Sequence, residues 1–306
     1  MITTKKIKGM EIEPPKKAAF QIETDPDFMK LHCLCLLSGR RGGGKSVAVA
    51  NLIRLAKDKG YFDKVWLITP TYYSNKEIWD IAKIKSPQDK SLRGEVDDEP
   101  EVFEPTRDVL RKMDGLLDKE RKLWEEHLTS KKRWKEFEKD MKRDLGNVDG
   151  EKLVDYYERG FMNLQGAPKW KYKHDGPGRC AIVIDDAVGT DLYNKPSSGL
   201  TQFCISHRHR AKGVGCSVFM LVQSYCCKEG VPRPIRENCT HLCLFKLKDE
   251  NQLDKIHKEI GCDMNMEKFD DIFKHATEEP YCFLTVDFCP KEDKKQFRKN
   301  FNEYLY

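Results

Sequence analysis

The chain has 306 residues, of which 39% are hydrophobic and 34% charged, and a formal net charge of +5. This length and apolar content allow one substantial core, and the mildly basic charge permits nucleic-acid binding without requiring it, because phosphate binding depends on a local basic patch. No apolar run reaches the roughly 18 residues of a membrane span, and the polar start lacks the apolar core of a secretory signal, so we expect neither.

The 12 cysteines are scattered and form no Cys-x-x-Cys pair. Several lie inside apolar runs, so we expect reduced, buried thiols in an intracellular compartment. Cys239 and Cys243, with His241 between them, give a weak zinc signal. The alternation of that segment instead predicts a half-buried strand.

Residues 1–25 are polar and predict a loosely held arm before a single domain over 26–306. The apolar run 31–37 predicts the first buried strand of that domain. After it comes Gly39-Arg40-Arg41-Gly42-Gly43-Gly44-Lys45-Ser46, which has the G-x-x-x-x-G-K-[ST] spacing of a phosphate-binding loop, and residues 47–53 predict the helix that must follow such a loop.

Each part of this loop has a physical task. Glycines let backbone N–H groups turn toward a polyphosphate, and the helix N-terminus adds a favourable dipole. Lys45 can neutralise the β- and γ-phosphates, and Ser46 can offer its hydroxyl to Mg²⁺. A chance glycine turn would not explain the strand, the Lys-Ser pair and the helix together. The expected nucleotide-binding residues are Gly39, Arg40, Arg41, Gly42, Gly43, Gly44, Lys45, Ser46 and Val47.

Residues 64–69 predict a second buried strand, after which the chain changes character. Over about 83–178 it is strongly charged, and apolar residues at helical spacing between 107 and 145 predict an amphipathic helix within a charged helical insertion. The simplest interpretation is a solvated helical surface on the main domain. The functional alternative is an element that contacts DNA or a partner protein.

Beyond the insertion, short apolar runs alternate with helical segments. This pattern favours an α/β fold with a mainly parallel central sheet and helices on both faces. The predicted elements are strands over 180–184, 215–222 and 240–247, helices over 250–260 and 266–275, a strand over 281–287 and a basic helix over 291–305.

Two carboxylates, Asp185 and Asp186, directly follow the strand over 180–184. Because ligands bind at the carboxyl ends of strands in open α/β sheets, we expect the pair beside the phosphate loop. We assign Asp185 to the Mg²⁺ shell and Asp186 to orienting or deprotonating the attacking water. The alternative is a simple turn or helix cap. Gln223 ends the strand over 215–222 and is expected to sense the γ-phosphate.

Two arginine-rich segments, 206–213 and 231–238, complete the candidate set. Arg208, Arg210 and Arg236 could each act as an arginine finger on the γ-phosphate of a neighbouring subunit, or hold DNA phosphates. A solvated basic loop is the alternative for each of them.

In combination, these segments resemble the genome-packaging ATPases of poxviruses, giant viruses, virophages and Polinton/Maverick elements, which belong to the FtsK–HerA superfamily of P-loop NTPases. The resemblance covers about residues 30–90 and 178–290. Its most specific parts are Leu-Val-Gln-Ser-Tyr at 221–225 and Pro-Ile-Arg-Glu-Asn at 234–238. It implies an ASCE-type sheet, with the carboxylate strand between the neighbours of the phosphate-loop strand.

The resemblance also implies ATP hydrolysis with Mg²⁺ and a homo-oligomeric ring that threads double-stranded DNA into a preformed capsid, with capsid proteins as further partners. The expected location is a host compartment, either a cytoplasmic virus factory or the nucleus, and the virion. Lys45 and Ser46 match the family's phosphate-loop positions, Asp185 its magnesium-site acid, Asp186 its second acid and Gln223 its polar sensor. The insertion over 83–178 is long for this family, so no role transfers into it.

Two other functions remain open at this point. A P-loop nucleotide or small-molecule kinase needs a lid and an acceptor pocket, whereas a double carboxylate followed by a Gln-ended strand suits attack by water better. A nucleotide-gated scaffold that does not hydrolyse would be favoured by a damaged lysine or acidic pair, and both are intact.

Overall fold

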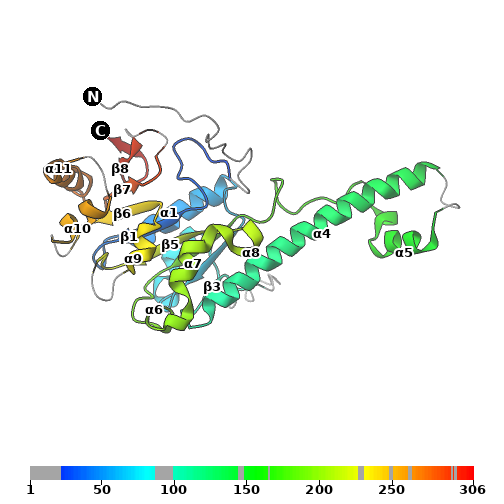
Figure 1. Cartoon of the computed structure of the whole chain (residues 1–306), viewed down its shortest axis with the longest axis horizontal. Coiled ribbons are helices and arrows are strands. Elements are labelled where there is room, and N and C mark those ends of the chain that lie inside the picture. Colours follow the sequence, from blue (N-terminus) through cyan, green and yellow to red (C-terminus); the bar gives the residue numbers. More distant parts are fainter. Residues whose placement is uncertain are drawn as a thin grey trace, which may run out of the picture.

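The computed structural model describes residues 22–86, 99–143, 148–164, 166–226, 231–247, 251–260, 264–290, 292 and 295–306. Most of the polar arm expected over 1–25 lies outside these ranges. One nine-stranded sheet, in the order β3-β2-β4-β5-β1-β6-β7-β8-β9, runs through the body of the protein (Figure 1).

The sheet is parallel from β3 to β6 and antiparallel from β6 to β9. This arrangement confirms the expected α/β class with a mainly parallel sheet. Its strands are β1 (Leu34–Ser38), β2 (Lys64–Ile68), β3 (Val102–Phe103), β4 (Cys180–Ile184), β5 (Cys216–Val222), β6 (His241–Phe245), β7 (Phe283–Asp287), β8 (Phe297–Lys299) and β9 (Glu303–Leu305).

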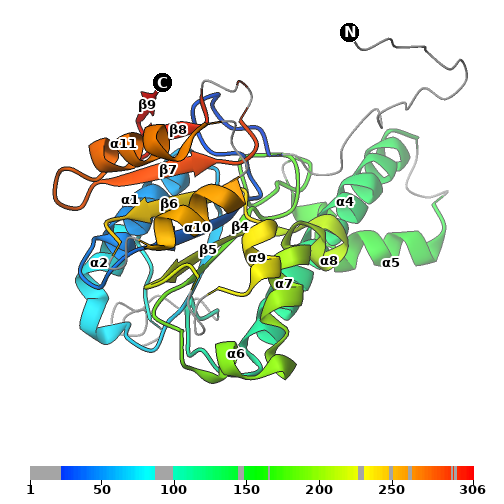
Figure 2. The ribbon, with the colours of Figure 1, turned by 60° about the vertical axis from the view of Figure 1, so that its left-hand side comes forward.

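Helices cover both faces of this sheet (Figure 2). Residues of α1 and α2 pack on one face, and residues of α7, α9, α10, α11 and the start of α4 pack on the other. The helices are α1 (Lys45–Asp58), α2 (Lys76–Ile81), α4 (Val109–Arg143), α5 (Gly150–Glu158), α6 (Asp191–Asn194), α7 (Leu200–Ser206), α8 (Arg210–Gly213), α9 (Arg233–Glu237), α10 (Asn251–Ile260) and α11 (Met266–Ala276).

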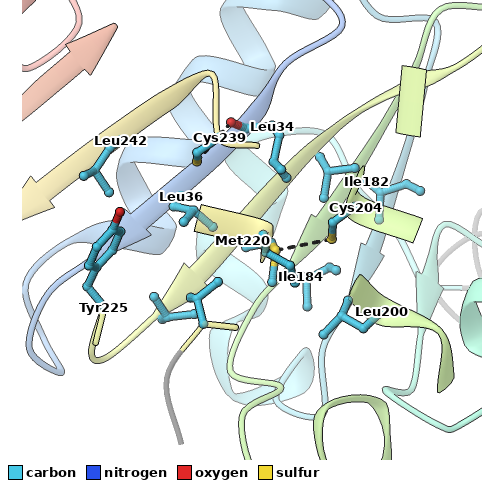
Figure 3. Close-up of a cluster of buried hydrophobic side chains, with 14 of the residues drawn as sticks. Leu34, Leu36, Ile182, Ile184, Leu200, Cys204, Met220, Tyr225, Cys239 and Leu242 are labelled. Carbon is cyan, nitrogen blue, oxygen red and sulfur yellow. Dashed lines mark hydrogen bonds between the residues drawn. The ribbon is translucent and has the colours of Figure 1, made fainter. Parts of the chain in front are cut away.

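Because successive strand residues point to opposite faces, every strand in the middle of the sheet contributes to two cores. On the face shown in Figure 3, Leu36, Ile184 and Met220 come from three strands, and Cys204 of α7 packs on them with its Sγ 3.6 Å from Met220 Sδ. Burial on both faces explains why these strands have unbroken apolar sequences. It also corrects the expectation of a half-buried strand at 239–243, since β6 is buried along its length.

The helix predicted between 107 and 145 is confirmed as α4, which has 35 residues and is therefore about 50 Å long. Its first turns pack into the main core through Val109 and Met113. The rest extends away from the sheet to a tip that carries α5 (Figure 1). At that tip a separate small core forms from Trp134, Phe137, Tyr156 and Phe161.

The predicted terminal helix over 291–305 is wrong, because that segment contains the hairpin β8–β9. Pairing with β7 decides the conformation: an exposed edge strand offers unpaired backbone groups, and Phe297 pairs with Val286 and is buried against the core. Asn300, at φ 54°, occupies the left-handed conformation after β8.

The expected place of the carboxylate strand is also wrong. The strand that leads to Asp185 is β4, which pairs with β2 and β5, whereas the phosphate-loop strand β1 pairs with β5 and β6. One strand, β5, therefore separates the loop from the carboxylates. Among the described residues, no helix is both long and apolar enough to cross a membrane.

Candidate nucleotide site

The glycine-rich segment 39–44 connects the end of β1 to the first turn of α1. It is fixed to the strands on either side, since the Gly39 N–H donates to the carbonyl of Val222 (3.3 Å) and the Arg40 N–H donates to that of Lys246 (3.4 Å). A Cβ added at Gly39 would lie 2.4 Å from the Cβ of Phe245, so only glycine fits there. The loop thus has a defined shape at the N-terminus of a 14-residue helix, where backbone N–H groups favour an anion.

The side chain of Lys45 forms hydrogen bonds with the backbone of this loop. Its Nζ donates to the carbonyl oxygens of Gly39 (2.7 Å) and Arg40 (3.1 Å). A lysine ammonium has three donors, so one more can meet a phosphate oxygen. Burial lowers the Lys45 pKa, while the nearby charges of Asp185 and Asp186 act in the opposite direction.

Ser46 meets the carboxylate strand directly. Its hydroxyl donates to Asp185 Oδ2 over 3.1 Å. Asp185 is only 5% exposed. The backbone N–H of Asp185 donates to the carbonyl of Ile68. Burial raises the pKa of Asp185 to about 6, and the Ser46 hydrogen bond opposes that rise. This hydroxyl and carboxylate fit Mg²⁺, which takes oxygen ligands and usually only one or two from protein carboxylates.

Asp186 follows Asp185 but is exposed. It adopts a left-handed backbone conformation with φ 52°, which aspartate tolerates better than most residues. Its charge acts on the pKa of both Lys45 and Asp185. The second acid therefore belongs to the same charge cluster while remaining accessible to water.

Gln223 comes directly after β5, and it too is exposed. The register pairs Ser38 with Val222, so β1 and β5 end at the same level. Gln223 therefore follows the strand that lies between the phosphate loop and Asp185. The structure brings Lys45 and Ser46 to the edge where Asp185, Asp186 and Gln223 follow their strands.

The three candidate arginines are not part of this cluster within one chain. Arg210 pairs with Asp114 at 3.0 Å, and Arg236 pairs with Glu259 at 2.8 Å. Arg208 is exposed, and its carbonyl oxygen lies 2.7 Å from where a Cβ on Gly215 would be. That contact places it at the amino end of β5, the edge opposite the phosphate loop.

Sequence reasoning missed one residue beside the loop. Tyr281, just before β7, lies against Gly44: a Cβ added there would be 3.3 Å from Tyr281 Cβ and Cδ1. An aromatic residue in a turn before a strand gives no sequence signal of such a contact. Tyr281 and Gly44 come together only because β6 and β7 follow β1 in the order of the sheet.

No protein-family model matches the chain, and a search of curated proteins also finds no match. Solved structures with a similar arrangement include the genome-packaging NTPase of Sulfolobus turreted icosahedral virus 2 in complex with ATP-gammaS, at 15% identity and a TM-score of 0.43, covering 92% of this chain and 100% of that one.

Two others are EssC (ATPases 2 and 3) from Geobacillus thermodenitrificans and the pCW3 conjugation coupling protein TcpA. EssC has 13% identity and a TM-score of 0.42, covering 90% of this chain and 40% of that one. TcpA has 15% identity and a TM-score of 0.43, covering 90% and 63%. Similarity at this level does not establish a shared activity.

Proposed function

We propose that this protein is an ATP-hydrolysing motor that moves double-stranded DNA into a viral or virus-like capsid. The observation that carries the ATPase part is the meeting of the phosphate loop with the buried carboxylate, through the 3.1 Å hydrogen bond from Ser46 to Asp185. The DNA and capsid parts depend on the family resemblance of residues 221–225 and 234–238.

In this proposal the loop N–H groups and Lys45 bind the β- and γ-phosphates of ATP. Ser46 and Asp185 would hold Mg²⁺, which when bound neutralises charge on the phosphate oxygens. Asp186, accessible to water, orients the attacking water and accepts its proton. Gln223 lies on the strand between these groups and contacts the γ-phosphate or that water.

The positions of the three candidate arginines support a homo-oligomeric ring. Arg208 lies at the sheet edge opposite its own phosphate loop, so it can act on a γ-phosphate only if that phosphate belongs to another copy of the chain. A homo-oligomeric ring places one such edge against the next nucleotide site. Arg210 and Arg236 would first have to leave Asp114 and Glu259. Double-stranded DNA and capsid proteins are the proposed partners, in a host compartment or the virion.

The test is phosphate release from ATP with Mg²⁺, measured with and without duplex DNA. We expect release that increases with duplex and is lost in Lys45→Ala. A P-loop kinase would instead transfer phosphate to an added nucleoside or small-molecule acceptor with little release to water. A nucleotide-gated scaffold would bind ATP and release none. Either result would contradict the proposed function.

A further inference from the structure

Tyr281 combines two features that packing does not explain. It is 72% exposed, and its backbone has φ 67°, in the left-handed region that bulky residues rarely occupy. Backbone strain of this kind is concentrated at ligand sites, where the surrounding structure holds it in place. The next aromatic residue, Phe283, already anchors the strand, since its ring stacks on Phe245 with centroids 4.5 Å apart.

The ring of Tyr281 lies against the phosphate loop. A Cβ added at Gly44 would be 3.3 Å from Tyr281 Cβ and Cδ1 and 3.7 Å from Cγ. Gly44 directly precedes Lys45, so the absence of a side chain there lets an aromatic ring approach the residue before the phosphate-binding lysine. Most of the tyrosine surface remains exposed even with this contact.

The sheet order gives the site two distinct sides. From β1, the carboxylate strand β4 lies beyond β5, whereas β7 lies in the opposite direction beyond β6. A nucleotide with its β- and γ-phosphates in the loop directs its terminal phosphate toward Asp185 and Asp186. Its nucleoside end must then extend away from the carboxylates, on the side where Tyr281 lies.

We propose that Tyr281 is the stacking platform for the nucleobase of the bound nucleotide. This inference rests on the proposed function and extends it to base recognition. An exposed aromatic ring stacks on any base through its π-face, so the platform would add affinity for the base of a nucleotide without contributing to the phosphate contacts. The left-handed backbone at Tyr281 would hold the ring beside the loop before the nucleotide arrives.

The experiment compares ATP with inorganic tripolyphosphate, which has the phosphates but no base, in calorimetric binding to the full chain with Mg²⁺. Tyr281→Ala should weaken ATP binding about ten- to hundredfold and leave tripolyphosphate binding unchanged, and Tyr281→Phe should keep wild-type affinity for both. Tyr281→Gly, which suits the left-handed backbone, should behave like the alanine variant and separates stacking from strain. Tyr157→Ala removes a similarly exposed tyrosine (75%) from α5 and serves as the matched control.

The outcomes separate the two proposals. If the wild type binds both compounds and the alanine and glycine variants lose neither, or lose both equally, the base platform is wrong and the nucleotide site stands. If the wild type binds neither compound, the proposed function itself fails.

Discussion

The Ser46 hydroxyl donates a hydrogen bond to Asp185 Oδ2 over 3.1 Å, joining residues 139 positions apart in the chain. Ser46 lies in the first turn of α1, after the loop that follows β1, and Asp185 directly follows β4. In the sheet, β5 lies between β1 and β4. This contact brings a phosphate-binding loop and a desolvated carboxylate into one site.

Lys45→Ala should abolish hydrolysis and remove most nucleotide binding, because it deletes the charge that faces the terminal phosphates. It also removes the Nζ hydrogen bonds to Gly39 and Arg40 that close the loop. Nucleotide affinity by calorimetry and phosphate release measure the two effects. Lys59→Ala, at the other end of α1, is the control and should retain both. Equal activity of the two variants would contradict the role of Lys45.

Asp186→Asn should leave nucleotide binding intact and lower turnover by about 10²–10⁴, the usual contribution of a general base. Binding survives because Ser46 and Asp185 remain in contact. Single-turnover hydrolysis measures the chemical step, and nucleotide affinity is the control. Normal hydrolysis by both Asp186→Asn and Asp185→Asn would show that the acids after β4 do not take part.

Mg²⁺-dependent nucleotide binding should weaken as pH falls through 6. Burial raises the pKa of Asp185 to about 6, so below that pH its carboxyl is protonated and loses its affinity for a cation. ATP titrations at fixed Mg²⁺ between pH 5 and pH 8 would show the fall. In Asp185→Asn, affinity should be lower and should no longer change near pH 6. A wild-type profile that is flat across this range would contradict the assignment of Asp185.

The same group should make the protein without Mg²⁺ less stable as pH rises. Its folded pKa of about 6 lies above its ordinary value of 3.8, so the folded state binds more protons between these pH values. The contribution of Asp185 to the free energy of unfolding is therefore fully present below about pH 4 and is lost as pH rises through about 6. The whole contribution is at most about 3 kcal/mol. Asp185→Asn should raise stability at pH 7 in urea unfolding, and a destabilised variant would argue against this.

Arg208→Ala should lower turnover by up to about 10³ without changing nucleotide affinity or thermal stability, if it acts on a neighbour's γ-phosphate. Arg210→Ala and Arg236→Ala should instead lower stability, because each loses an ion pair and stacking on an aromatic ring. Mixing Arg208→Ala with Lys45→Ala protein should restore some activity through hybrid interfaces. Intact assembly without any rescue would indicate a site completed within one chain.

Removing the far half of α4 and the α5 tip should leave basal hydrolysis unchanged, since that tip has its own core. The rings of Trp124 and Trp170 lie 5.1 Å apart, so a short linker can replace residues 127–167. If the tip docks onto a capsid, stimulation by naked duplex persists and only packaging fails. If it binds DNA, duplex stimulation is lost, and the salt dependence of binding becomes shallower.

We favour docking for this tip because acidic residues are interleaved with basic ones along α4, which would interrupt a continuous DNA track. If the shortened protein is unchanged in both assays, the tip is a solvated helical surface with no role in DNA binding or capsid docking. Trp134→Ala is a milder version of the same test. It should loosen the tip core, as measured by hydrogen exchange, without affecting phosphate release.

The phosphate loop and the Asp185 segment could be predicted from sequence because their signals are local: a fixed spacing after one buried strand, and two acids after another. The contact between Tyr281 and Gly44 could not, because it depends on β6 and β7 following β1 in the sheet. The hairpin at 297–305 was missed for a similar reason, since pairing with the edge of β7 determines it. The start of α4 packs into the main core and its far end packs into the separate tip core. The helical period of the sequence predicts the helix but not this division, which tertiary packing determines.

Hydrolysis at this site should drive movement along duplex DNA. The most direct measurement is displacement of a third strand from a triplex at the end of a duplex, with purified protein, ATP and Mg²⁺. We predict displacement by the wild type that requires hydrolysable ATP and is absent in Asp186→Asn, while Tyr157→Ala displaces as the wild type does. Vigorous ATP hydrolysis in the presence of duplex, with no displacement by assembled wild-type protein, would contradict the account.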